Sequence, residues 1–145
     1  MFVDEVVEID DELLAALNRL IPQLGANKTA LSRDELNLLV HSDASSLLIA
    51  RQPDKNGGIV GALTLAVYRV PTGIRSIVED VVVDENFRRL GIAEGLLSRA
   101  IELAREAGAN SVSLTSSPHR QAANLLYRKM GFQLRETNAY FLLLK

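Results

Sequence analysis

The sequence contains no cysteine and only two histidines among its 145 residues. Without cysteine the chain has no disulfide, no thiolate metal ligand and no cysteine nucleophile, so any chemistry must use oxygen or nitrogen groups. His41 and His119 lie far apart, and neither belongs to a pattern with metal-ligand spacing. We therefore expect no metal site.

The sequence also lacks a basic excess and a long apolar run. Its 16 Lys and Arg residues are outnumbered by 18 Asp and Glu residues, and the formal net charge is −2, which argues against general nucleic-acid binding. No stretch approaches the roughly 18 apolar residues of a membrane span, and the first residues are acidic where a signal peptide would be basic. We expect a cytoplasmic protein with neither a membrane nor a nucleic acid as a partner.

Several motifs that define other enzyme classes are absent as well. The chain has no G-x-x-x-x-G-K-[ST] and no G-x-G-x-x-G, which disfavours nucleoside triphosphates and dinucleotides as ligands, and it has no G-x-S-x-G. Its composition, 48% apolar and 23% charged residues, is that of an ordinary globular protein. Because its length suits one compact unit, we expect a single domain over residues 1–145.

Apolar periodicity predicts an α/β (α+β) protein with elements in the order β-α-α-β-β-β-α-β-α-β-β. Ser32 and Glu35 form an S-x-x-E capping box at the start of the second helix. The expected helices cover 11–21, the segment after Ser32, 94–107 and 121–130. The expected strands cover 2–9, 47–51, 59–70, 74–83, 112–115, 133–137 and 139–144.

The strand Ile74–Val83 should lie in the middle of the sheet, because its end at Val81–Val83 is apolar on both faces. A helix connects this strand to the strand Val112–Thr115, and such a crossover joins parallel strands. The pattern therefore predicts a mixed, mostly antiparallel sheet with about four helices.

The segment that leads from this central strand into the longest helix has the composition of an anion site. It reads Asp84-Glu85-Asn86-Phe87-Arg88-Arg89-Leu90-Gly91-Ile92-Ala93. A helix N-terminus carries unpaired N–H groups and a partial positive charge. The small residues Gly91 and Ala93 let the backbone approach a phosphate, and Arg88 and Arg89 supply cationic donors. Pyrophosphate is the natural ligand of such a loop.

Three segments resemble the GNAT acetyltransferases. Arg88-Arg89-Leu90-Gly91-Ile92-Ala93 matches the R/Q-x-x-G-x-G/A pattern of that family's pyrophosphate loop, Val78–Asp84 resembles its fourth strand, and Ala122–Phe132 resembles its last helix and following strand. The segments stand in the family's order, so the chain resembles the Gcn5-related N-acetyltransferase (GNAT) superfamily over nearly its whole length. The resemblance implies the GNAT acyl-CoA N-acyltransferase fold, with splayed parallel fourth and fifth strands, and an acyltransferase that uses acetyl-CoA and no metal.

The resemblance also implies which residues bind the cofactor. The pantetheine arm would lie between the splayed strands, bonded to the strand backbone in the manner of an added strand. Backbone N–H groups from Arg89 to Glu94 would hold the pyrophosphate, and Asn124 would help to fix the pantetheine arm. The implied cofactor-binding set is Val81, Val82, Val83, Arg88, Arg89, Leu90, Gly91, Ile92, Ala93, Glu94 and Asn124.

Tyr127 matches the tyrosine that lies near the thioester sulfur in this family, which makes it a candidate catalytic acid. Asn124 and Tyr127 are three residues apart and therefore share a helix face. A tyrosine hydroxyl, with a pKa of about 10, can protonate a leaving thiolate whose thiol has a pKa of about 8.5. The alternative is a half-buried aromatic residue with its hydroxyl at the surface.

Glu79 is the candidate general base. An attacking amine with a pKa of about 10.4 is protonated at neutral pH, so a base or a chain of waters must take its proton. Simple strand alternation places Glu79 on the face of Ile77, Val81 and Val83, and Asp80 on the other face. Some family members use a carboxylate on this strand; a substrate-orienting acid or a partner of a nearby arginine are the alternatives.

These features predict an N-acetyltransferase that moves an acetyl group from acetyl-CoA to a primary amine, of a small molecule or a protein, by direct attack in a ternary complex. The alternatives are a non-catalytic acyl-CoA-binding or regulatory module of the same fold and a structural interaction protein. No motif identifies the acceptor, whose site we expect near residues 27–34 and around Asn138 and Tyr140. Homodimers are common in the family, and the sequence leaves the oligomeric state open.

Overall fold

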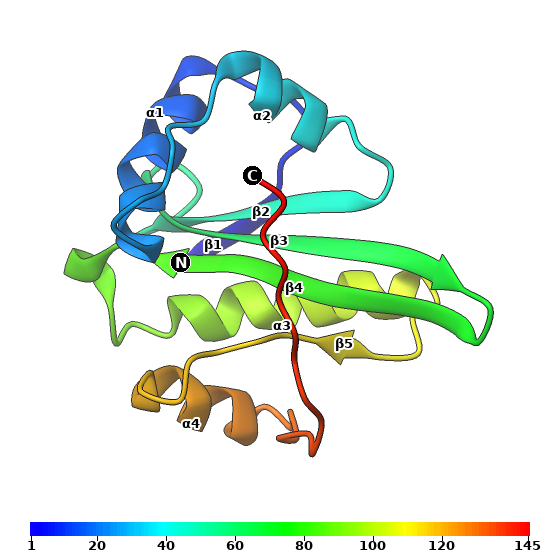
Figure 1. Ribbon diagram of the computed structural model, residues 1–145. Coiled ribbons are helices and arrows are strands. Elements are labelled where there is room, and N and C mark those ends of the chain that lie inside the picture. Colours follow the sequence, from blue (N-terminus) through cyan, green and yellow to red (C-terminus); the bar gives the residue numbers. More distant parts are fainter. The chain divides into compact units, whose positions relative to one another are not determined.

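The computed structural model describes residues 1–145. Its residues form two compact units, Met1–Leu114 and Thr115–Lys145. The first unit contains a five-stranded sheet in the order β1-β2-β3-β4-β5, with α1 and α2 on one face and α3 on the other (Figure 1). The strands are β1 (Phe2–Glu5), β2 (Ser45–Gln52), β3 (Gly58–Val70), β4 (Gly73–Val83) and β5 (Val112–Ser113). The helices are α1 (Asp11–Leu20), α2 (Arg33–Val40) and α3 (Ile92–Glu106), with short 3-10 helices η1 (Ile21–Leu24) and η2 (Glu85–Phe87).

Two helices of the first unit, α1 and α2, begin at residues whose side chains cap them. The Asp10 carboxylate accepts a 2.8 Å hydrogen bond from the Leu13 N–H at the start of α1. At α2 the predicted capping box is confirmed, because Ser32 Oγ accepts from the Glu35 N–H at 3.1 Å and the Glu35 carboxylate accepts from the Ser32 N–H at 2.9 Å. The bonds to Ser32 lower the pKa of Glu35. No helix is long and apolar enough to cross a bilayer.

Each face of the sheet packs against its own helices. The α1 and α2 face carries Ala62 of β3 and Val82 of β4, and the core cluster there comprises Leu13, Ala16, Leu17, Leu20, Leu36, Leu47, Ile49, Ile59, Ala62 and Val82. On the other face, a Cβ at Gly61 would meet the side chain of Ile92 at 3.1 Å and that of Leu96 at 3.3 Å. Glycine at position 61 therefore lets α3 approach β3 closely.

A β-bulge interrupts β4 at Asp80 and Val81. The register between β3 and β4 shifts between Ala62 and Thr64, so two residues of β4 lie opposite a single residue of β3. Asp80 has a φ of 51°, a left-handed conformation in which Asp is more common than most residues. The bulge bends the strand and changes the direction of the side chains that follow it.

This bulge overturns part of the side-chain arrangement expected from simple alternation. Glu79 pairs with Thr64, which lies on the α1 and α2 face of β3, and Ile77 shares that face with Glu79. Val83 instead pairs with Gly61, the residue that lies against α3. The prediction that Glu79 and Val83 share a face is therefore wrong, because one extra residue reverses the alternation.

β4 and β5 are parallel, as predicted, and they separate after a short paired stretch. Their register joins Ser76 to Val112 and Ile77 to Ser113. β4 continues from Val78 to Val83 without a partner on this side, and β5 ends at Ser113, two residues before the predicted end at Thr115. The edge of β4 that faces β5 is thus unpaired from Val78 to Val83. This separation of the two parallel strands is the splayed geometry that we expected.

The second unit contains α4 (Gln121–Lys129), close to its predicted range. The two predicted terminal strands, 133–137 and 139–144, are not formed, and residues 132–145 have no regular secondary structure. The large apolar side chains of this segment are exposed: Leu134, Tyr140, Phe141, Leu142, Leu143 and Leu144. Strand propensity alone does not form a strand, because its backbone needs a partner strand for hydrogen bonding.

Candidate active site

The loop between η2 and α3 has a backbone suited to an anion. Arg89 has a φ of 65° and Gly91 a φ of 77°, both in the left-handed region. Holding a non-glycine residue there costs of the order of 1–3 kcal/mol, and such strain is concentrated at binding sites. Alternation of left- and right-handed residues turns successive N–H groups into a concave nest that binds anions.

The start of α3 faces open space. Gly91 is the N-cap of α3 and provides no side-chain capping bond, and the first intrahelical bond runs from the Gly95 N–H to the Gly91 carbonyl at 3.0 Å. A Cβ at Gly91 would have no protein atom within 4 Å. The helix N-terminus is therefore accessible to a ligand, and its partial positive charge favours an anion.

The side chains of the loop divide between anchoring and exposed groups. Ile92 is 2% exposed and fixes the loop in the core, so only its backbone can meet a ligand. Arg88 and Arg89 are exposed, and Arg88 Nε donates to the Val83 carbonyl at 3.4 Å. Leu90 is an exposed apolar side chain beside these cations. The loop thus presents two guanidinium groups next to its N–H groups.

The predicted pantetheine-binding strand lies directly before this loop. Val82 is buried, whereas Val81 and Val83 are half-buried, and β5 does not pair with this part of β4. Apart from the Val83 carbonyl, which accepts from Arg88, backbone groups on this edge are available to an amide-containing ligand, which can bind as an added strand. Val81–Val83 thus stand at the unpaired end of β4, directly before the segment that leads into α3.

Glu79 lies on β4 before the bulge, and its side chain is exposed. Its partner across the sheet is Thr64. No Lys or Arg forms an ion pair with its carboxylate, so the alternative of an arginine-paired glutamate is not observed. The carboxylate is accessible for proton transfer or for orienting a cationic group.

Asn124 and Tyr127 lie on α4 in the second unit. The Asn124 Nδ2 donates to the Ser117 carbonyl at 3.0 Å, which ties the helix to the segment before it. Tyr127 is half-buried and packs edge to face against Phe132, with ring centroids 6.0 Å apart. Burial raises the pKa of Tyr127 above its usual value of 10, and the charge of Arg120 acts in the opposite direction. The hydroxyl is therefore protonated at neutral pH.

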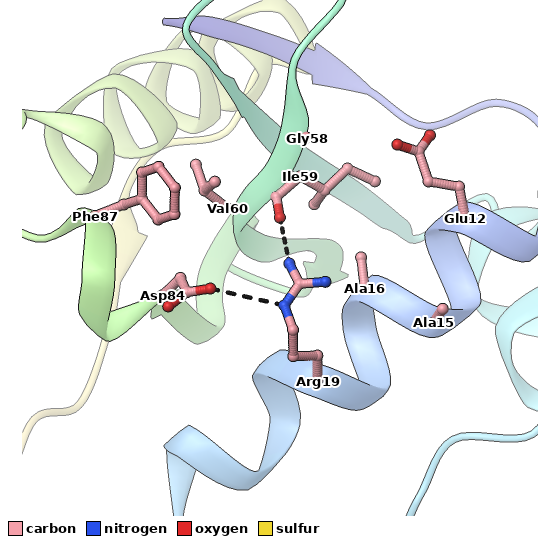
Figure 2. Close-up of a pocket in the computed structure, with 9 residues that line it drawn as sticks. All are labelled: Glu12, Ala15, Ala16, Arg19, Gly58, Ile59, Val60, Asp84 and Phe87. Atoms are coloured by element: carbon pink, nitrogen blue, oxygen red, sulfur yellow. Dashed lines mark hydrogen bonds and ion pairs between the residues drawn. The ribbon is translucent and has the colours of Figure 1, made fainter.

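A pocket that sequence reasoning did not anticipate lies between α1 and the ends of β3 and β4 (Figure 2). It has a volume of about 400 Å³. Its lining residues are Glu12, Ala15, Ala16, Arg19, Gly58, Ile59, Val60, Asp84 and Phe87. Asp84 directly follows the buried strand β4. A charged residue at such a position needs a partner for its carboxylate, and this was the one feature of the sequence that pointed to the pocket. No group of three or more His, Asp or Glu side chains is placed to bind a metal.

Comparison with known proteins identifies the family. The model of the acetyltransferase (GNAT) family matches residues 11–132, which is most of the chain. The chain therefore belongs to the GNAT acetyltransferase family, a family of acyltransferase enzymes. The match extends from α1 to the end of α4 and so includes the β4–α3 loop.

Two curated relatives are similar to parts of the chain. The chain is 34% identical over 83 residues to glucosamine 6-phosphate N-acetyltransferase of Trypanosoma brucei brucei, a match that covers 55% of this chain and 54% of that protein. It is 40% identical over 62 residues to GCN5-related N-acetyltransferase 4, chloroplastic, of Arabidopsis thaliana, covering 43% of this chain and 21% of that protein. The chain thus spans about half of the first relative and about a fifth of the second.

Solved structures share the fold over nearly the whole chain. An aminoglycoside acetyltransferase from an uncultured soil metagenomic sample, in complex with trehalose, has a TM-score of 0.83 at 21% identity and covers 97% of this chain and 93% of its own. A Trypanosoma brucei acetyltransferase has a TM-score of 0.77 at 24% identity and covers 97% of this chain and 99% of its own. At such identity the likeness shows the fold, which is the predicted fold class.

Proposed function

We propose that this protein transfers an acetyl group from acetyl-CoA to a primary amine, with both substrates held in one ternary complex. The observation that carries the proposal is the loop before α3, where left-handed backbone at Arg89 and Gly91 meets the uncapped helix start. This combination of N–H groups, helix charge and exposed arginines suits the pyrophosphate of CoA. The open edge at Val81–Val83 suits the amides of the pantetheine arm.

In the proposed reaction the neutral amine nitrogen attacks the thioester carbonyl carbon, and the carbonyl π electrons move to the oxygen. Collapse of this tetrahedral intermediate re-forms the carbonyl and breaks the C–S bond, which gives an amide and a CoA thiolate. One proton leaves the nitrogen and one proton reaches the sulfur. We assign the second transfer to Tyr127, the residue that matches the family's tyrosine near the thioester sulfur. Its hydroxyl is protonated throughout the neutral range, and the burial that raises its pKa also makes it a weaker acid.

We assign to Glu79, directly or through one water, the removal of the proton that an ammonium acceptor must lose before its nitrogen can attack. Glu79→Gln should lower kcat/KM at neutral pH by up to about 100-fold and leave the affinity for acetyl-CoA unchanged. The loss should shrink for acceptor amines of low pKa, because these are already neutral. Asp80→Asn is the control, since it neutralises the adjacent exposed carboxylate and keeps a residue that tolerates positive φ. An equal loss for amines of every pKa would instead assign Glu79 to orienting the acceptor.

Binding of CoA should raise the melting temperature. A ligand that binds only the folded state at about 100 times its Kd contributes roughly 2.7 kcal/mol, which for a chain of this size corresponds to a rise in Tm of roughly 5–10 °C. Thermal unfolding followed by circular dichroism, with and without CoA, measures the shift. An unchanged Tm at millimolar CoA would contradict the cofactor assignment.

Turnover distinguishes an enzyme from a non-catalytic CoA-binding module. Because the chain has no cysteine, a thiol reagent detects released CoA without a background from the protein. We propose amino sugars as the first acceptors to screen, since glucosamine 6-phosphate N-acetyltransferase and an aminoglycoside acetyltransferase are among the similar proteins. Amino acids, polyamines and lysine peptides complete the library. A module without activity would bind CoA and release none with any amine.

A further inference from the structure

Asp84 ends β4 and begins the proposed cofactor loop as a nearly buried carboxylate. It is 7% exposed, its Oδ1 accepts from the Asn86 N–H at 3.1 Å, and its Oδ2 lies 3.7 Å from Arg19 Nε on α1. Burial of a carboxylate is costly unless the charge has a partner. The conformation of the chain at the start of the loop therefore depends on a side chain from the first helix.

Arg19 reaches across one side of the pocket and joins three elements (Figure 2). Its Nη2 donates to the Ile59 carbonyl at 2.5 Å, while its Nε lies beside Asp84. The planar guanidinium suits this double role, because its donors point in fixed directions. A single side chain thus links α1, the beginning of β3 and the end of β4.

A second bond fixes the next residue from the same side. The Gln23 side-chain oxygen accepts from the Glu85 N–H at 3.0 Å, and η1, which carries Gln23, packs beside β4. The Asp84 N–H also donates to the Val60 carbonyl at 2.8 Å. The entry to the loop is therefore fixed before the chain reaches Arg88.

We propose that Arg19 is a positioning residue for the cofactor loop. By holding Asp84 it sets the direction in which residues 88–94 present their N–H groups to the pyrophosphate of CoA. The inference rests on the proposed function. It assigns a role to a residue of the first helix that lies outside the loop motif and forms an ion pair with Asp84. Because Arg19 acts on the phosphate-binding segment, its effect should be confined to donors that carry phosphate.

The test compares acetyl-CoA with S-acetylpantetheine, a donor that lacks the pyrophosphate. In Arg19→Met the apolar stem remains and the guanidinium is lost, so the Asp84 charge has no partner. We expect KM and Kd for acetyl-CoA to rise by about 10-fold, kcat at saturation to stay within about twofold, and kcat/KM for S-acetylpantetheine to be unchanged. A residue that only stabilised the fold would not discriminate between the donors.

Arg51→Met is the matched control. Arg51 donates to both carboxylate oxygens of Glu12 on α1 at 2.9 Å and to the Gly57 carbonyl at 2.9 Å. Like Arg19, it pairs with one carboxylate and one backbone carbonyl, but it links α1 to β2 and not to the cofactor loop. Arg51→Met should lower the Tm and leave the KM for both donors unchanged.

Two further variants keep the test decisive where Arg19→Met folds poorly. Arg19→Lys retains the positive charge but lacks the several N–H donors of the guanidinium, and it should give an intermediate rise in the KM for acetyl-CoA. Asp84→Asn should weaken acetyl-CoA binding to a similar extent, and the double variant Arg19→Met/Asp84→Asn should be no worse than Arg19→Met, because coupled residues are non-additive.

The outcomes separate the inference from the proposed function. The positioning role of Arg19 would be overturned by an unchanged KM for acetyl-CoA in the Arg19 and Asp84 variants, or by an equal loss of kcat/KM with both donors. In either case, binding of CoA by the wild type would still support the cofactor site. A wild-type protein that does not bind CoA by calorimetry would overturn both.

Discussion

Gly91→Glu should weaken CoA binding by at least roughly 100-fold, because it places a carboxylate at the start of α3 where the pyrophosphate is proposed to bind. Like charges brought together at an interface cost several kcal/mol. Apart from the adjoining residues, no protein atom lies within 4 Å of a Cβ at Gly91, so the new side chain begins in open space where the ligand is proposed to bind. Isothermal titration of the wild type and the variant with CoA measures the change.

The left-handed backbone at Gly91 makes a matched control necessary, since any side chain there is strained. Gly108, just beyond the other end of α3, has a φ of 78° against 77° for Gly91. Gly108→Glu therefore imposes similar backbone strain and the same added charge, away from the loop. Both variants should lose stability, of the order of 1–2 kcal/mol for a left-handed non-glycine residue, and only Gly91→Glu should lose CoA.

Gly91→Ala separates strain from charge at the same position. It should lower the Tm as Gly108→Ala does and retain most of the affinity for CoA. If a folded Gly91→Glu binds CoA as the wild type does, the phosphates lie elsewhere and the loop is not the pyrophosphate site.

The loop was predictable because its determinants are local. Arg88, Gly91 and Ala93 lie within one short segment of the sequence, and the helix that follows shows clear apolar spacing. A helix N-terminus needs no distant partner to carry its partial charge. In the structure these residues lie directly before and at the start of α3. The left-handed conformation of Arg89 could not be predicted, because the sequence contains no signal for it.

Several features that depend on the exact pairing between distant segments were not predictable. The bulge at Asp80 follows from the register between β3 and β4, and it moves Val83 to the face opposite Glu79. Asp84 stands out only as a carboxylate directly after an apolar strand, and nothing in the sequence marks Arg19 as its partner until the fold brings α1 beside the end of β4. The terminal segment 133–144 has strand-like composition, but without a partner strand its backbone forms no ladder.

Tyr127→Phe should lower kcat by about 10²-fold and leave the affinity for acetyl-CoA nearly unchanged. The substitution removes one hydroxyl and keeps the ring, so the edge-to-face contact with Phe132 and the packing of α4 should persist. General acid catalysis contributes about 10²- to 10⁴-fold. A thiolate is a fair leaving group even without protonation, which favours the lower end of this range.

The pH dependence tests the same role independently. Burial raises the pKa of Tyr127 above 10, so its acidic form is present below that pKa and is lost as the pH rises through it. The wild-type kcat should therefore stay constant through neutral pH and decrease only above pH 10, as a descending limb of the pH profile, provided that the protein stays folded there. Tyr127→Phe should lack this limb, because no phenol remains to ionise.

Tyr68→Phe is the control for loss of a tyrosine hydroxyl. Tyr68 lies on β3 in the first unit and is 43% exposed, and no catalytic role is assigned to it. Steady-state kinetics should show a wild-type kcat for Tyr68→Phe and a reduced kcat with unchanged Kd for Tyr127→Phe. If Tyr127→Phe acetylates the best acceptor at the wild-type rate, Tyr127 is a packing residue of α4, the thiolate leaves unprotonated or takes its proton from water, and the cofactor loop retains its assignment.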